Sequence, residues 1–246
     1  MKPIYTPKGA AKEYGDYAIN IYTGCPHRCY YCFAPSVLRR DRESFHSHVE
    51  PREGIVEAVR KQIASEKITG KLIHLCFTCD PYPKGHDSTA TRGIIQLLKE
   101  SGNHVQILTK NGRDAMRDFD LLDNGDRFGI TYAGYDGYCS DYKYIPRAEL
   151  NSGSPHDRLY ALCDAYERGI FTWVSCEPVL NALDVLNFIQ LADYVDLWKI
   201  GKLNYHPSNI DWKQFGELVE NVCRGAHRNY YIKDSLRKEM EAHDES

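Results

Sequence analysis

The sequence lacks any uninterrupted apolar run close to the roughly 20 residues that a membrane-spanning helix needs. Its first nine residues, Met-Lys-Pro-Ile-Tyr-Thr-Pro-Lys-Gly, contain no apolar core of the kind found in secretory signal peptides. The cysteine total is odd, at nine, which argues against a complete disulfide framework and suits a reducing compartment. We therefore expect a cytoplasmic protein without a membrane segment.

An excess of charge is also missing, since 31 Lys and Arg residues face 34 Asp and Glu residues and the formal net charge is −3. This balance argues against a strongly basic protein that binds nucleic acid non-specifically, but it allows a local basic patch. Neither an internal repeat nor a linker marks a second domain in the 246 residues. We expect a lead-in over residues 1–16, one core over 17–207, and a helical extension over 208–246 packed on that core.

Three cysteines stand close together between Thr23 and Pro35, where Cys25, Cys29 and Cys32 form a C-x3-C-x2-C pattern. Three thiolates can hold three corners of a four-iron four-sulfur (4Fe-4S) cluster and leave one iron open for a substrate or cofactor. A structural zinc ion normally takes four protein ligands, often as two pairs, and here the second pair is missing. The pattern favours a cluster, with a zinc site, a disulfide and buried structural cysteines as the alternatives.

Short apolar runs alternate with helical patterns along most of the chain. Strands are expected over residues 17–22, 71–77, 105–108, 128–132, 171–176 and 194–200, and helices over 54–65, 88–101, 113–122, 155–168, 182–191 and 212–224. A short extra strand over 230–232 and a terminal helix over 233–242 complete the pattern. This alternation predicts parallel strands, and because six units fall short of the eight of a closed barrel, we expect an α/β fold with a partial (β/α)6 TIM-like barrel in one domain.

Polar residues follow nearly every expected strand. They are Thr78, Cys79, Asp80, Thr109, Lys110, Thr131, Glu177, Lys202, Asn204 and His206. The carboxyl ends of parallel strands meet at one mouth of a barrel, so these side chains are expected to converge there. A plain loop or capping role remains the alternative for each of them.

Three segments fall outside the alternation. Residues 37–52 are rich in arginine and are expected to form either a solvated loop or an anion contact near the cysteines. Residues 133–154 form a long segment rich in glycine and tyrosine, which includes Tyr135 and Cys139 and is expected to be functional or mobile. Residues 224–233 mix basic and aromatic side chains, a combination that either tracks a nucleic-acid strand or forms a solvated helix end.

The cysteine pattern, with Tyr31 directly before the third cysteine, resembles the signature of the radical S-adenosylmethionine (radical SAM) enzymes. The resemblance implies that the open iron binds S-adenosylmethionine (SAM), and that the reduced cluster cleaves SAM to methionine and a 5′-deoxyadenosyl radical. It also implies an external electron donor of the flavodoxin or ferredoxin type. Lys110 suits the SAM carboxylate, and Thr131 or Glu177 suits the ribose or the amine. Tyr31, Thr78 and Asp80 complete the expected cofactor-binding set.

Further segments are similar to the spore photoproduct lyase-like branch of this family. They are Thr78–Pro83, Leu108–Lys110 and the stretch from Glu149 to Leu159. In the lyase, a cysteine after strand two returns hydrogen to a thymine dimer in DNA that is being split. This chain has Phe77 at that position, so Cys79, Cys139 and Tyr135 become the candidate catalytic residues.

The resemblance implies hydrogen abstraction from a substrate, with a nucleobase or modified nucleotide in DNA as the leading candidate. A peptide or small-molecule substrate is the alternative within the family. An alternative of another class is a non-enzymatic protein that holds zinc or a structural cluster.

Overall fold

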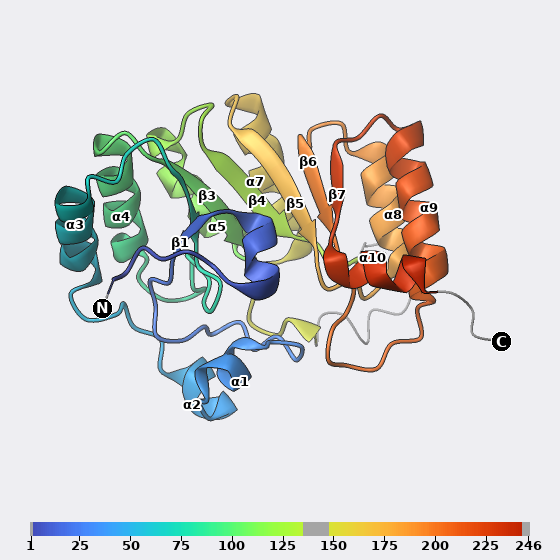
Figure 1. Ribbon diagram of the computed structural model, residues 1–246, viewed down its shortest axis with the longest axis horizontal. Helices are drawn as coiled ribbons and strands as arrows, with labels where there is room; N and C mark the ends of the chain where they lie inside the picture. The colour runs from blue at the N-terminus through green and yellow to red at the C-terminus, as the bar shows by residue number, and fades with distance from the viewer. Residues whose placement is uncertain (1, 135–147, 243–246) are drawn as a thin grey trace.

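The computed structural model describes residues 2–134 and 148–242, and at its centre lies one sheet of seven parallel strands. In sheet order, which is also chain order, the strands are β1 (Tyr17–Ile19), β2 (Leu72–Leu75), β3 (His104–Thr109), β4 (Arg127–Thr131), β5 (Phe171–Cys176), β6 (Leu197–Ile200) and β7 (Tyr230–Ile232). The sheet curls but stays open, as Figure 1 shows, with β1 and β7 at its two edges. The expected α/β partial barrel is confirmed, and the short run over 230–232 adds a seventh strand to the six.

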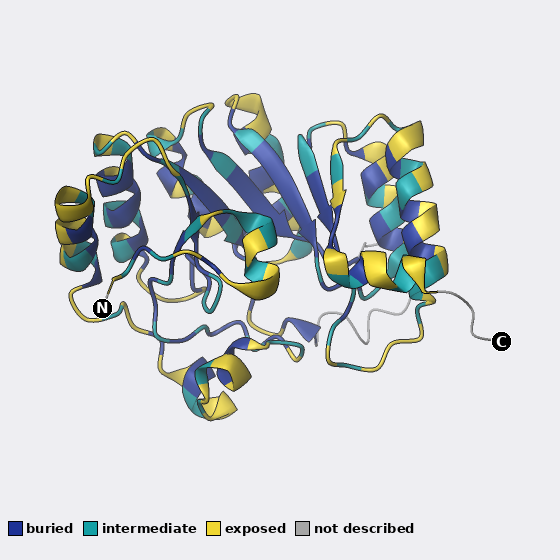
Figure 2. Cartoon of the chain, in the orientation of Figure 1, coloured by how far each residue is buried: buried dark blue, intermediate teal, exposed yellow. Residues whose placement is uncertain are grey.

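Helices cover the convex face of the sheet. They are α3 (Ile55–Glu66), α4 (Thr89–Glu100), α5 (Gly112–Ala115) with the 3-10 helix η2 (Met116–Leu121), α7 (Pro155–Glu167), α8 (Ala182–Leu191) and α9 (Trp212–Gly225). The last helix, α10 (Asp234–Glu241), lies at the end of β7 and packs against α9. The core between the layers includes fully buried Ile73, Leu75, Val105, Ile107 and Ile130 of the strands. Figure 2 shows the strands buried and the outward faces of the helices exposed, as expected for amphipathic helices on a parallel sheet.

The concave face of the sheet is polar and aromatic, because successive residues of a strand point to opposite faces. Its side chains include His74 of β2, Gln106 of β3 and Trp173 of β5. Gln106 Nε2 lies 3.0 Å from His74 Nδ1, and His74 stacks on Phe77 with 4.2 Å between ring centroids. The inside of the barrel is therefore a packed polar interior.

The first sixteen residues are more ordered than expected. Tyr5 pairs with Ala18 beside β1, and residues Gly9–Tyr14 form the 3-10 helix η1, which Figure 1 shows lying across the concave face. The Tyr14 ring packs against His74, Phe77 and Trp173 inside the barrel. The lead-in thus covers part of the concave face of the sheet. The sequence does not predict this contact, because the lead-in has no periodic pattern.

Two other expectations differ from the structure. Residues 37–52, expected to form a solvated loop or helix end, contain the last two residues of the short helix α1 (Ala34–Leu38) and all of α2 (Arg42–Ser47). Asp41 caps α2 by accepting a 2.8 Å hydrogen bond from the backbone N–H of Ser44, and helices this short carry too few residues to show an apolar period. The helix expected over 113–122 is α5 followed by η2, where the backbone tightens to the 3-10 form.

No helix within residues 2–134 and 148–242 is long and apolar enough to cross a membrane. The division into lead-in, core and C-terminal extension stays a prediction.

Candidate active site

The three clustered cysteines lie on the loop that leaves β1 at the mouth of the barrel. Cys29 is buried, Cys25 and Cys32 are partly exposed, and all three are free thiols. The backbone N–H of Cys32 donates to the carbonyl of Cys29 at 3.0 Å, which turns the loop back on itself. Burial raises the pKa of Cys25 and of Cys32, and it raises that of Cys29 to about 12. Burial disfavours the charged form of these three neighbouring thiols, and a bound cation would favour it, so the three thiols fit a metal centre.

Two arginines shape this loop, Arg40 between α1 and α2 and Arg42 at the start of α2. Arg42 donates to the carbonyl groups of Cys29, of Tyr30 at 2.9 Å and of Cys32 at 3.2 Å, and Arg40 donates to the carbonyl of Thr23. These contacts satisfy backbone acceptors that no strand or helix pairs. These arginines were expected to be solvated or to contact an anion. In the structure, Arg40 and Arg42 instead bind backbone carbonyl groups of the cysteine loop.

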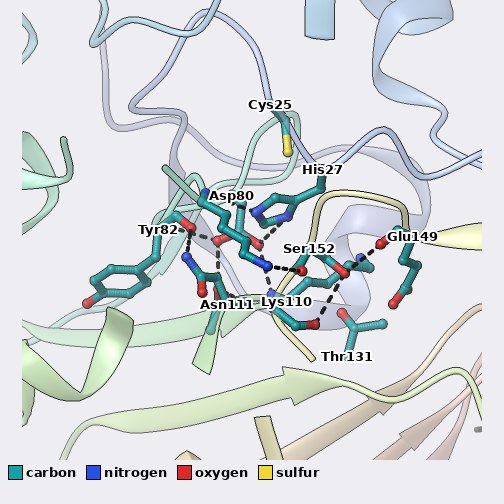
Figure 3. A network of polar contacts seen from close by, with 12 residues as sticks. Cys25, His27, Asp80, Tyr82, Lys110, Asn111, Thr131, Glu149 and Ser152 are labelled. Atoms are coloured by element: carbon teal, nitrogen blue, oxygen red, sulfur yellow. Dashed lines mark hydrogen bonds and ion pairs between the residues drawn. The ribbon is translucent and has the colours of Figure 1, made fainter. Parts of the chain in front are cut away.

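A buried aspartate ties the cysteine loop to β2 and β3. Asp80 accepts hydrogen bonds from the Thr109 hydroxyl at 2.6 Å and from the backbone N–H groups of Lys110 at 2.8 Å and Tyr82 at 2.9 Å. Its second oxygen lies 3.5 Å from Nδ1 of His27, which sits between Cys25 and Cys29 in the sequence. Figure 3 shows His27, Asp80 and Asn111 in one connected network.

The ring of His27 is held from both sides. Its Nε2 accepts a 3.2 Å hydrogen bond from the backbone N–H of Lys84, which places the proton of the neutral ring on Nδ1, facing Asp80. Burial lowers the pKa of His27 to about 4, so the ring is neutral at pH 7. The expected cofactor-binding role of Asp80 stays a prediction. In the structure the Asp80 carboxylate contacts the Thr109 hydroxyl, two backbone N–H groups and the His27 ring.

A buried arginine organises the other side of the cysteine loop. Arg158 of α7 pairs with Glu149 at 2.6 Å, and it also donates to the carbonyls of Lys110 and Thr131, each at 3.1 Å. Glu149 in turn accepts a hydrogen bond from the Tyr31 hydroxyl. Figure 3 shows Glu149 and Ser152 beside Lys110 and Thr131 at the ends of β3 and β4.

Residues 148–151 lie directly against the cysteine loop. Glu149 forms a β-bridge with Cys29, the Tyr30 N–H donates to the Ala148 carbonyl at 3.0 Å, and the Asn151 N–H donates to the His27 carbonyl at 3.1 Å. The Arg158–Glu149 pair therefore connects α7, β3, β4 and the cysteine loop. Sequence reasoning assigned no role to either residue, although both lie in the stretch that resembles the lyase branch.

Lys110 lies beside the cysteines, as expected. Its ammonium stands 5.6 Å from the centre of the Tyr31 ring. Burial lowers the pKa of Lys110, but the neighbouring Cys29 and Glu149 outweigh that effect and leave the pKa raised, so the side chain keeps its charge. This position suits an anionic ligand next to the cysteine loop.

The remaining expected residues divide between this site and a second network. The Thr78 hydroxyl is buried without a hydrogen-bond partner among the described residues, and Thr131 is buried at the end of β4. Glu177, after β5, is bound by Lys233, by Tyr14 at 3.0 Å and by Asn204 at 3.2 Å. The expected catalytic residues Tyr135 and Cys139 lie outside the described residues.

Comparison with known protein families assigns the chain to one of them. The Radical SAM superfamily model matches residues 19–183, which include the cysteine loop and the strands β2 to β5. The chain therefore belongs to the radical SAM superfamily, whose members use SAM and an iron–sulfur cluster.

Two sequence relatives are uncharacterized proteins. One, from Mycobacterium tuberculosis, is 27% identical over 251 residues and is matched over 94% of this chain and 73% of its own length. The other, from Methanocaldococcus jannaschii, is 28% identical over 192 residues, which cover 76% of this chain and 68% of the relative.

Solved structures share the fold at low identity. A spore photoproduct lyase matches with a TM-score of 0.69 and 13% identity over 93% of this chain and 79% of the lyase. A lyase with bound AdoMet and dinucleoside spore photoproduct gives a TM-score of 0.68, also at 13% identity, over 92% and 78%. Streptococcus suis SuiB bound to precursor peptide SuiA gives 0.63 at 10% identity over 91% of this chain and 50% of SuiB.

Proposed function

We propose that this protein is a radical SAM enzyme that holds a 4Fe-4S cluster through Cys25, Cys29 and Cys32 and cleaves SAM reductively. The observation that carries the proposal is the set of three free thiols on the β1 loop, within the segment that matches the superfamily. When bound, the cluster and SAM supply a 5′-deoxyadenosyl radical that abstracts hydrogen from the substrate. An external electron donor of the flavodoxin or ferredoxin type supplies the electron.

The protein's own residues orient the cofactor in this proposal. Lys110 presents a positive charge beside Cys29 and suits the SAM carboxylate. The Thr78 hydroxyl, which has no hydrogen-bond partner within residues 2–134 and 148–242, and Thr131 suit the SAM ribose or amine. Asp80 and Glu149, each engaged with several protein groups, act as positioning residues that hold His27 and Tyr31 in the cysteine loop. Glu177 remains a candidate cofactor contact from the β5 end of the mouth.

We propose a nucleobase or modified nucleotide in DNA as the substrate class. In support, a structural neighbour is a lyase bound to a dinucleoside spore photoproduct. The cysteine loop itself carries exposed Tyr30 and, at its end, exposed Phe33, aromatic surfaces on which bases can stack. A peptide substrate is the competing candidate, because SuiB shares the fold and is bound to a precursor peptide.

The direct test is formation of 5′-deoxyadenosine. We would purify the protein without oxygen, load it with iron and sulfide, add SAM and dithionite, and measure deoxyadenosine by chromatography. The wild type should form it, the Cys29→Ala variant should lose it entirely, and the Lys110→Met variant should need about tenfold more SAM for half-maximal rate because one charge-assisted contact is worth about 1.4 kcal/mol or more. Cys163→Ala is the matched control, since Cys163 is a free, partly exposed cysteine on α7. An equal loss in the Cys29 and Cys163 variants would contradict the proposal.

A further inference from the structure

A second pair of thiols lies at the end of β2, outside the motif that the proposed cluster uses. Cys76 and Cys79 form a C-x2-C pattern, both are free, and their side chains are hydrogen-bonded to each other. Neither the fold nor the proposed SAM chemistry needs two adjacent thiols at this place.

The backbone brings the two side chains together. Cys76 has a φ of 68°, a left-handed conformation that costs a non-glycine residue about 1 kcal/mol or more. Its N–H donates to the carbonyl of Ile19 at 2.8 Å. The Asn20 side-chain oxygen accepts from the N–H groups of both Phe77 at 2.8 Å and Thr78 at 3.0 Å, so the chain turns tightly around Asn20. A tight turn with two residues between the cysteines suits the Cα separation of roughly 4.4–6.8 Å that disulfides need.

Cys79 has the surroundings of a reactive thiol. Its Sγ accepts a 3.4 Å hydrogen bond from the N–H of Tyr22, and the side chain is partly exposed, whereas Cys76 is buried. Burial raises the pKa of Cys79, but hydrogen bonds from Cys76 and from the backbone of Tyr22 and Ile21 outweigh it and leave the pKa lowered. Burial raises the pKa of Cys76. The nucleophile in thiol–disulfide exchange is the thiolate, so Cys79 is the thiol that reacts first.

The pair faces away from the barrel interior. Phe77, between the two cysteines, stacks on His74 and contacts Tyr14 inside the barrel, whereas Cys79 contacts the backbone that links β1 to the cysteine loop. The expected role of Cys79 as a hydrogen donor to substrate stays a prediction, and this placement favours a different chemistry.

We propose that Cys76 and Cys79 are a redox site that cycles between a dithiol and an intramolecular disulfide. The Cys79 thiolate attacks a sulfur of a small-molecule disulfide, forms a mixed disulfide and releases one small thiol. Cys76 loses its proton to solvent and attacks the Cys79 sulfur, which releases the second small thiol. The protein loses two electrons and the small disulfide gains two. The new bond restrains the loop that carries Asp80, and through it the contact to His27.

The test is a redox titration of the intact, cluster-loaded protein. The chain is equilibrated without oxygen in buffers of reduced and oxidised glutathione, quenched in acid, alkylated and digested with trypsin. Cleavage after Lys71 and Lys84 puts both cysteines in one peptide, residues 72–84. We expect this peptide to change from doubly alkylated to unalkylated and lighter by two hydrogen atoms as oxidised glutathione increases, and to revert with dithiothreitol.

Two controls make the result specific. Cys163 lies alone in the tryptic peptide 159–168 and should stay alkylated over the range in which the pair oxidises. In a Cys76→Ser variant, Cys79 should instead stop at the mixed disulfide with glutathione. The proposal is overturned if residues 72–84 remain doubly alkylated while Cys163 is already modified, or if the disulfide joins either cysteine to another part of the chain. Deoxyadenosine formation does not enter this readout, so the result is independent of the proposed function.

Discussion

At the scale of single residues, buried charges around the cysteine loop decide which groups are left for a ligand. Arg158, Glu149, Asp80 and His27 are buried and engage one another or the backbone. The Arg158–Glu149 ion pair needs both of its members, since an unpaired buried charge costs several kcal/mol, on the order of 3–5. Lys110, by contrast, keeps a charge beside Cys29 and is the residue most suited to meet an anion.

Replacing Arg158 by Met should destabilise the fold strongly. The two side chains of the Arg158–Glu149 pair are 1% and 3% exposed, so Glu149 would become an uncompensated buried carboxylate, at a cost of about 3–5 kcal/mol. Urea unfolding measures this loss. The control is Arg168→Met, which breaks an ion pair with Asp164 on the surface at the other end of α7 and should cost about 1 kcal/mol or less. Equal losses in the two variants would mean that the buried pair has no special role.

His74 should make the fold sensitive to acid. Burial and then the charge of Lys199 lower its pKa from 6.5 to about 3. Between these values the unfolded chain binds the proton and the folded chain does not, so stability falls as the pH decreases from about 6.5 towards 3, by up to about 1.4 kcal/mol per pH unit.

The His74→Phe variant should therefore show a shallower loss of stability between pH 6.5 and pH 4 in urea unfolding. Phe128→Leu serves as the control, because it weakens the core without removing a titrating group. The interpretation fails if His74→Phe and Phe128→Leu leave the pH slope equally unchanged.

At the scale of elements, the 3-10 helix η1 is held inside the barrel by a second buried network. The Tyr14 hydroxyl donates to Glu177 at 3.0 Å and lies 3.1 Å from Ser175 Oγ and 3.3 Å from Lys233 Nζ. Burial lowers the pKa of Lys233, but Tyr14, Glu177 and Glu13 outweigh it and leave the pKa raised. One lysine thus links η1 to the ends of β5 and β7.

The Lys233→Met variant should loosen η1 from the barrel. Glu177 is partly buried, with 19% of its side chain exposed, and would lose its cation, which predicts about 1–3 kcal/mol of destabilisation and faster hydrogen exchange over residues 9–16. Lys202→Met, which removes a partly exposed pair with Glu239, is the control and should cost about 1 kcal/mol or less. If the exchange of residues 9–16 is the same in both variants, Lys233 does not anchor the helix.

At the scale of the whole molecule, the sequence predicts the architecture well because the strands and most helices are local patterns. The strand over 171–176 and the helix over 182–191 agree with β5 and α8 to the residue. The cysteine loop is equally visible, since its signal lies in the spacing of three residues.

What the sequence does not show is which polar residues the fold brings together. Tyr14 and Lys233 are separated by 219 residues and meet only because the sheet curls and η1 lies across its concave face. The engagement of Asp80 by His27 depends on a turn between β1 and α1 that no periodic pattern encodes. Asp80 and Glu177 were expected to contact SAM, but their carboxylates already accept hydrogen bonds from other residues of the protein. These partners come from distant parts of the chain, so the sequence does not predict them.

The measurement that tests the central claim most directly is the electron paramagnetic resonance spectrum of the loaded, dithionite-reduced protein with and without SAM. The account predicts about four irons and four sulfides per chain, held by the three cysteines, and a reduced-cluster signal that changes when SAM is added. The Cys29→Ala variant should lose the signal. A protein that binds zinc in place of iron, or a cluster whose spectrum ignores SAM, would contradict the account.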